Sequence, residues 1–365
     1  MSSKARILLG VVMTLSLLSG FLHEIWPDAP LSFKRLHIFG FNLLTGGSLI
    51  LYHIVGKGVF TPRLLAYFVF ALLYALFAAA GWYIPALALS IPLFLLVESV
   101  RIERYSLFPV DFFRRAPVSE KFEQASLLCL SIGIVFASLV ILNNEYLRLI
   151  HYEKLTIEVF FLGYSFPVSL ITMAIMFSFM TERERRFHAV LEELSFWLVN
   201  LGVIVFFVLI ILELTIPVIA IAIILFATVW MIFFLFVATA PNVQQKTFLV
   251  SGMIFLLFTA LTGILYVATY LYPLLDEYRE PLLVLHAMVS LYGWNLSGLF
   301  IIIRWNDFPI QLNSALAIAL HWSIVLVLAP LGEYVLPVSV LAIAAYVALL
   351  LVVLAGNANH EEAGR

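Results

Sequence analysis

Two histidines, each near the start of a long apolar segment, have the clearest potential for chemistry. His37 lies five residues after Ser32, a residue type that caps helices, and His286 lies five residues after Pro281. If both segments cross a membrane as helices, the two imidazoles lie at a similar depth, because each residue adds about 1.5 Å of rise. Two neutral imidazoles at one depth can ligate both axial positions of a haem iron. We therefore interpret His37 and His286 as candidate ligands of haem iron.

A structural interpretation stays open for both histidines. His37 follows Lys34 and a second basic residue, so it could simply face lipid headgroups, and a lone His286 could hydrogen-bond to a neighbouring helix. Two further intramembrane histidines, His53 and His321, lie nearer the other side of the membrane and form a second conceivable pair. His53 is sixteen residues beyond His37, about 24 Å along one helix, so these two cannot share one iron.

Neighbouring residues could complete a haem pocket around the first pair. Arg35 and Arg279 are candidates to pair with the haem propionates, because guanidinium groups bind carboxylates through paired hydrogen bonds. Aromatic and small residues close to the histidines could form a flat apolar slot for the porphyrin: Phe33, Phe39, Gly40, Phe41, Gly46, Gly47, Tyr292, Gly293, Trp294 and Gly298.

The composition places these segments in a lipid bilayer. The chain has 365 residues, of which 64% are hydrophobic and 12% are charged, against about 45–50% and about 25% in soluble proteins. The formal net charge of −2 gives no basic surface for nucleic acid. Cys129 is the sole cysteine, which excludes a disulfide framework and a cysteine-ligated cluster within one chain.

Hydropathy predicts an all-α polytopic membrane protein with about twelve transmembrane helices in a single domain, 1–365. A helix needs about 20 predominantly apolar residues to cross the hydrocarbon core of a bilayer. Segments of roughly that length occur at 6–23, 34–55, 64–81, 83–99, 123–143, 156–179, 189–212, 216–238, 247–272, 281–303, 314–330 and 335–355.

The distribution of basic residues predicts the orientation. With the N-terminus in the cytoplasm, fifteen of the twenty Lys and Arg residues fall on the cytoplasmic side and five on the other. Loops rich in Lys and Arg stay on the cytoplasmic side of a membrane. We therefore expect a cytoplasmic-type membrane, cytoplasmic N- and C-termini and a short cytoplasmic tail at 356–365.

Three similar segments indicate an internal repeat. Phe39-Gly40-Phe41-Asn42-Leu43 and Tyr292-Gly293-Trp294-Asn295-Leu296 share a pattern, and Leu162-Gly163-Tyr164-Ser165-Phe166 is a weaker version. Their glycines are 123 and 130 residues apart, close to four spans each time. One interpretation is three pseudo-symmetric four-helix units, 1–121, 122–246 and 247–355. The other is that helix packing or chance selects glycine beside aromatic and small polar residues.

The topology and two short motifs together resemble a known superfamily. Arg35-Leu36-His37-Ile38-Phe39-Gly40-Phe41 and Leu285-His286-Ala287-Met288-Val289-Ser290-Leu291-Tyr292-Gly293-Trp294 look like motifs of NnrS-like haem membrane proteins. Those proteins are relatives of the catalytic subunits of haem–copper oxidases and nitric oxide reductases. The resemblance implies a low-spin haem b held by His37 and His286, with electron transfer or a response to NO or O2.

The chain departs from that family at the copper site. The resemblance calls for a histidine in the sixth span and a His-His pair in the seventh, but 163–168 and 197–200 contain none. We therefore expect neither copper nor oxygen reduction, while a partner for electron transfer or another membrane subunit stays possible.

Two other functions remain open. A transporter or permease for a small neutral solute would place Asn42, Asn200 and Asn295, with Ser165, around a central cavity. A non-catalytic subunit of a larger membrane complex would need no site of its own. No motif of a soluble enzyme is present, so enzymatic activity is not assigned.

Overall fold

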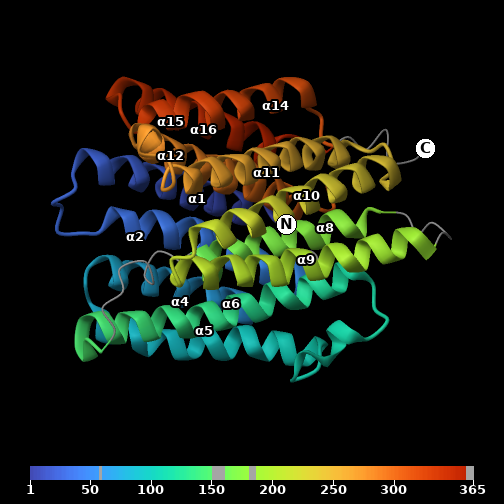
Figure 1. Ribbon diagram of the computed structural model, residues 1–365, viewed down its shortest axis with the longest axis horizontal. Coiled ribbons are helices and arrows are strands. Elements are labelled where there is room, and N and C mark those ends of the chain that lie inside the picture. The colour runs from blue at the N-terminus through green and yellow to red at the C-terminus, as the bar shows by residue number, and fades with distance from the viewer. Residues whose placement is uncertain (57–59, 150–160, 181–185, 359–365) are drawn as a thin grey trace.

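A computed structural model of the chain describes residues 1–56, 60–149, 161–180 and 186–358. Within these residues the chain is a bundle of long helices without a β-strand (Figure 1). Eleven of the described helices are long and apolar enough to cross a membrane, and Gly163–Ser178 is a shorter apolar helix. The chain is therefore an all-α polytopic membrane protein, as predicted.

The described helices occupy the places of the twelve predicted spans. The first five residues of the predicted span 156–179 and the end of the predicted tail, 359–365, lie outside the described residues. In chain order, with η for short π- or 3₁₀-helical segments, the elements are α1 (Ser3–Ile25), α2 (Phe33–Ile38), η1 (Phe39–Gly46), α3 (Gly47–Val55), α4 (Pro62–Ala79), α5 (Tyr83–Arg104), η2 (Pro109–Phe113), α6 (Val118–Leu142), η3 (Asn143–Leu147), η4 (Phe161–Ser165), α8 (Phe166–Ser178), α9 (Arg186–Ile211), α10 (Thr215–Thr239), α11 (Gln244–Ala268), η5 (Pro273–Tyr278), α12 (Arg279–Met288), η6 (Val289–Asn295), α13 (Leu296–Ile303), α14 (Ser314–Ser323), η7 (Ile324–Leu328), α15 (Ala329–Gly332) and α16 (Leu336–Ala355).

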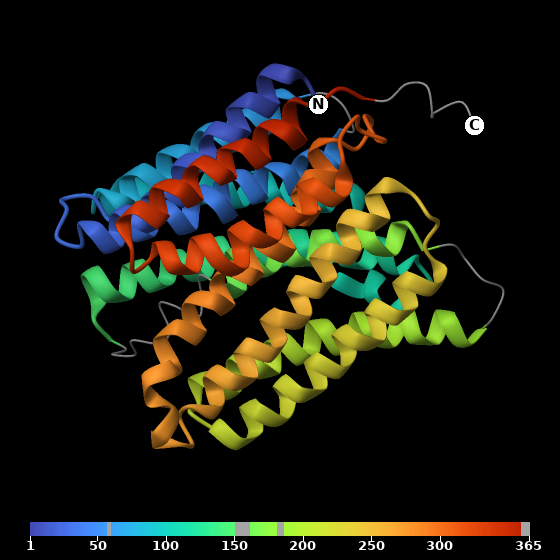
Figure 2. The ribbon, with the colours of Figure 1, turned by 90° about the horizontal axis from the view of Figure 1, so that it is seen from above.

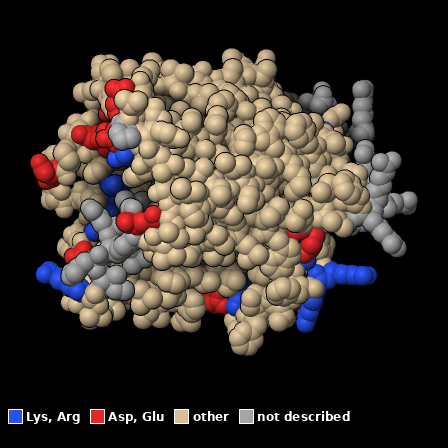
Figure 3. Space-filling model, viewed as in Figure 1, with Lys and Arg blue, Asp and Glu red and all other residues tan. Residues whose placement is uncertain are grey.

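The bundle has two faces, between which the helices run alternately in opposite directions. We call the face where α1 begins and α16 ends the termini face, and the other face the distal face (Figure 2). Charged side chains gather toward these two faces, and the band between them is almost free of charge in Figure 3. That band matches the hydrocarbon core of a bilayer. Which face is cytoplasmic stays a prediction.

Local capping chemistry sets where the helices begin. The hydroxyl of Ser32 accepts the backbone N–H of Arg35 at 3.4 Å and caps α2, which begins at Phe33, one residue before the predicted span. Thr61 caps α4 in the same way, with Pro62 at the first helical position. His37 therefore lies one turn inside its helix at the distal face.

Three spans form the centre of the bundle: the one that ends with α3, the one that ends with α13, and the shorter helix α8. The helix from Phe33 to Val55 is 89% buried over its apolar window, and the one from Leu274 to Ile303 is 83% buried. The other nine long helices are 22–50% buried, so they form the outer, lipid-facing layer. In the centre α3, α8 and α13 pack against one another. A Cβ at Gly298 on α13 would overlap the side chain of Thr172 on α8, so this glycine permits the close approach.

All three repeat motifs coincide with π-helical turns. The segments that begin at Phe39, Leu162 and Tyr292 overlap η1, η4 and η6, and two further π-helical turns, η3 and η7, lie elsewhere among the described residues. π-Helices are rare and frequently mark functional sites. Their recurrence at matching motifs supports the proposed repeat, which stays a prediction.

Candidate functional site

His37 is held against α1. The side chain is half-buried near the end of α2, and its Nδ1 lies 2.8 Å from the carbonyl oxygen of Ser16. The ring lies beside Gly20, where a Cβ would approach Nδ1 to 2.9 Å. Ser16 and Gly20 are one turn apart, so one face of α1 both binds this imidazole and makes room for it.

His286 is held against α11 in the same way. Its half-buried side chain places Nδ1 2.9 Å from the carbonyl oxygen of Thr259 and 3.3 Å from the hydroxyl of Thr262. A Cβ at Gly263 would approach the ring to 3.1 Å. Thr259 and Gly263 are again one turn apart, so the surroundings of the two imidazoles repeat on two different helix pairs.

These contacts determine which ring nitrogen carries the proton. A carbonyl oxygen only accepts hydrogen bonds, so Nδ1 of His37 and of His286 must donate, and Nε2 of each neutral ring keeps its lone pair. Among the described residues, Nε2 of neither ring has a hydrogen-bond partner. Proteins orient metal-ligating histidines by such a bond from the second ring nitrogen to a backbone carbonyl. Both imidazoles are therefore chemically suited to bind iron through Nε2.

The other two intramembrane histidines differ, because their Nε2 atoms are engaged. Nε2 of His53 lies 3.4 Å from Glu123 Oε1, and Nε2 of His321 lies 2.5 Å from the carbonyl oxygen of Tyr292. These contacts give His53 and His321 separate partners on different elements. The conceivable second pair therefore has no shared contact in the described part of the chain.

Tyr292 connects η6 to His37. Its hydroxyl lies 3.2 Å from Nδ1 of His37, and the centroids of the two rings are 5.8 Å apart. The Tyr292 ring also contacts Phe41 at a centroid distance of 4.9 Å. No direct hydrogen bond or ring contact joins His37 to His286 among the described residues. At the depth of His37, Tyr292 is the residue of the other histidine's span that contacts its ring.

Both arginines predicted to bind propionates have protein partners. Arg35 donates to the hydroxyl of Tyr83 at 2.8 Å, and its guanidinium also lies 5.1 Å from the centre of that ring. Arg279 donates to the hydroxyl of Thr269 at 3.2 Å and forms an ion pair with Asp276. The propionate role of both arginines stays a prediction.

A carboxyl group at the distal face affects the charge near the site. Glu333 follows the end of α15, and burial, followed by the nearby charge of Glu24, raises its pKa to about 7. This carboxyl group therefore changes its protonation state near neutral pH.

The three asparagines predicted to line a solute cavity form hydrogen bonds within or between helices. Asn42 and Asn200 each donate to the carbonyl one turn earlier in their own helix. Asn295 donates to the carbonyl and hydroxyl oxygens of Ser165 at 3.3 and 3.2 Å, which joins η6 to η4. Within the described part of the chain, Oδ1 of Asn42 and of Asn295 is buried without a hydrogen-bond partner. A solute cavity around these amides stays a prediction.

Sequence reasoning missed the residues that hold the imidazoles, although a signal for them is present. Ser16-Leu17-Leu18-Ser19-Gly20 and Thr259-Ala260-Leu261-Thr262-Gly263 share the order hydroxyl, any residue, Leu, hydroxyl, Gly. Each segment ends five residues before its helix ends, on α1 and α11. The pair of patterns could have been found by aligning the helix before each histidine.

The described side chains make no metal centre by themselves. Among the described residues, no three His, Cys, Asp or Glu side chains gather where they could hold a metal ion. Comparison of the chain with protein-family models and with curated proteins finds no match.

Proposed function

We propose that this chain binds haem b within the membrane, with His37 and His286 as the two axial ligands. The observation that carries the proposal is the matched environment of these two rings. Within the described residues, Nε2 of each has no hydrogen-bond partner, whereas Nε2 of His53 and of His321 has one. The proposed role is electron transfer or a response to a small gas such as NO or O2, together with an electron-transfer partner or another membrane subunit.

The chain's own residues would orient and tune the ligands. The carbonyls of Ser16 and Thr259 hold the Nδ1–H groups, which fixes both rings and makes Nε2 a stronger donor. When bound, haem supplies a one-electron redox couple. Because His37 and His286 would both bind the iron, they would favour electron transfer over reaction of a substrate at the iron. Since 163–168 and 197–200 contain no histidine for copper, the proposal excludes oxygen reduction.

Replacing either ligand should abolish the low-spin haem spectrum. We expect purified wild-type protein to carry about one low-spin haem b per chain, and His37→Ala and His286→Ala to lose that spectrum, because one histidine alone leaves an axial position open. The measurement is a reduced-minus-oxidised visible spectrum with haem quantified as the pyridine haemochrome. Gly263→Ala should reduce haem content without removing a ligand, because its Cβ would displace the His286 ring.

The matched control is His53→Gln, which alters a histidine whose Nε2 already faces Glu123. It should keep the wild-type haem content. A colourless, well-folded wild-type protein would overturn the proposal and favour a small-solute transporter or a non-catalytic subunit. So would a wild-type spectrum in both ligand variants.

We also propose that the termini face is cytoplasmic. Fifteen of the twenty Lys and Arg residues fall on this side of the predicted spans, which supports this orientation. A fluorescent reporter that folds only in the cytoplasm should therefore be bright when fused to the C-terminus. A dark fusion, paired with an active periplasmic reporter at the same position, would reverse the orientation.

A further inference from the structure

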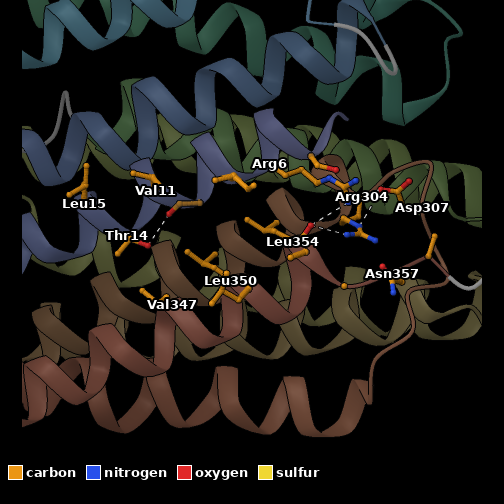
Figure 4. A pocket seen from close by; sticks show the side chains of 17 residues that line it. Arg6, Val11, Thr14, Leu15, Arg304, Asp307, Val347, Leu350, Leu354 and Asn357 are labelled. Atoms are coloured by element: carbon orange, nitrogen blue, oxygen red, sulfur yellow. Dashed lines mark hydrogen bonds and ion pairs between the residues drawn. The ribbon is translucent and has the colours of Figure 1, made fainter.

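A groove runs between α1 and α16 from the termini face into the membrane-spanning band. It has a volume of about 580 Å³, within the range of about 300–1,000 Å³ typical of ligand sites. Its walls are one face of each helix, with Val11 and Leu15 on α1 and Val347 and Leu350 on α16 (Figure 4). Most of its lining along the two helices is therefore apolar.

The end of the groove at the termini face carries charge. Arg6 Nη1 lies 3.0 Å from Asp307 Oδ2, and Arg304 Nε lies 3.3 Å from the same oxygen. Both guanidinium groups also donate to the carbonyl of Leu354, at 3.3 and 2.9 Å. Two guanidinium groups thus share one carboxylate, so these three side chains together carry one positive charge in excess.

The groove opens toward lipid rather than toward water. Its rim includes Ile7, Val11 and Leu351, whose side chains are 63%, 51% and 60% exposed on the apolar flank of the bundle. The α1 residues that line it run from Ser3 to Leu15, about 18 Å of helix. Half of a hydrocarbon core of about 30 Å is similar, so the groove spans one leaflet.

We propose that this groove binds an anionic phospholipid, with one acyl chain along α1 and α16 and the phosphate held by Arg6 and Arg304. The phosphate supplies negative charge to balance the second guanidinium group, and guanidinium groups bind phosphate through paired hydrogen bonds. A phospholipid fits better than a soluble anion because most of the groove is apolar and faces the bilayer. The proposal is independent of haem binding.

The test measures lipid retention by native mass spectrometry of the delipidated, detergent-purified full chain. The probes are dioleoyl phosphatidylglycerol, dioleoyl phosphatidylcholine, oleate and inorganic phosphate. Wild-type protein should retain phosphatidylglycerol in preference to phosphatidylcholine. Arg6→Gln should weaken phosphatidylglycerol binding about fivefold, the effect of about 1 kcal/mol for one basic residue at an anionic membrane surface.

Two further variants distinguish lipid binding in the groove from attraction of lipid to surface charge in general. Thr14→Phe should block the apolar part and reduce retention of phosphatidylglycerol while leaving both arginines in place. Arg63→Gln removes an exposed charge elsewhere on the termini face and should bind phosphatidylglycerol like wild type. Equal loss in Arg63→Gln and Arg6→Gln, wild-type retention in Thr14→Phe, or tighter binding of oleate or free phosphate would overturn the proposal.

Discussion

Replacing Gly133 or Gly163 by alanine is expected to lower the free energy of unfolding by about 3 kcal/mol, the upper part of the usual range for overpacking. The two residues bring α6 and η4 into backbone contact. A Cβ at Gly133 would lie 2.7 Å from the carbonyl carbon of Gly163, and a Cβ at Gly163 would lie 2.7 Å from Cα of Gly133. Because the obstacle is backbone on both sides, no side-chain rotation relieves the overlap, and the helices must separate.

Thermal unfolding of the detergent-purified variants measures this effect. Gly10→Ala on α1 is the matched control, because its Cβ would meet only Leu354 Cδ1 at an ordinary 3.4 Å. We expect the control to be at least as stable as wild type, since alanine favours helix over glycine by about 1 kcal/mol. An unfolding temperature for Gly133→Ala equal to that of the control would show that the two helices do not depend on this contact.

The number and positions of the spans could be predicted from hydropathy because the bilayer imposes length and polarity on each helix. The differences occur at charged ends. The predicted span 83–99 belongs to a helix that continues to Arg104, and the predicted start at 123 belongs to one that begins at Val118. In both places the helix includes charged residues that form ion pairs. These residues lower the mean hydropathy, so the predicted span stops short of the end of the helix. Lys121, for example, is 4% exposed and lies 2.7 Å from Glu193.

The depth of the two candidate ligands could be predicted, but their surroundings could not. Residue spacing gives the height of His37 and His286 along their helices, whereas the neighbours of each ring depend on helix rotation. Rotation is least predictable here because π-helical turns follow both histidines, at Phe39–Gly46 and Val289–Asn295. A π-helical turn holds more residues than an α-helical one, so side chains after it face directions that a 3.6-residue period does not predict. The contact of Tyr292 with His37 is one example.

Glu98→Ala is expected to destabilise the protein by about 3–5 kcal/mol, because it leaves the Arg101 guanidinium buried without its counter-ion. The side chains of Arg101 and Glu98 are 4% and 13% exposed. Nη2 of Arg101 lies 2.6 Å from Glu98 Oε2, and Nε lies 3.0 Å from both carboxylate oxygens. Its other acceptors among the described residues are the carbonyls of Ser106 and Leu107, and neither carries the negative charge of the lost carboxylate.

The matched control is Glu103→Ala on the same helix, which breaks the pair between Arg63 and Glu103. Those side chains are 52% and 65% exposed, so water screens the pair and its loss should cost less than about 1 kcal/mol. The double variant Glu98→Ala with Arg101→Met should recover much of the stability lost in Glu98→Ala, because removing both charges leaves none buried without a partner. Thermal unfolding of the three variants tests the cause as well as the size of the effect. Without recovery in the double variant, the damage would come from lost packing at Glu98 and not from an unpaired charge.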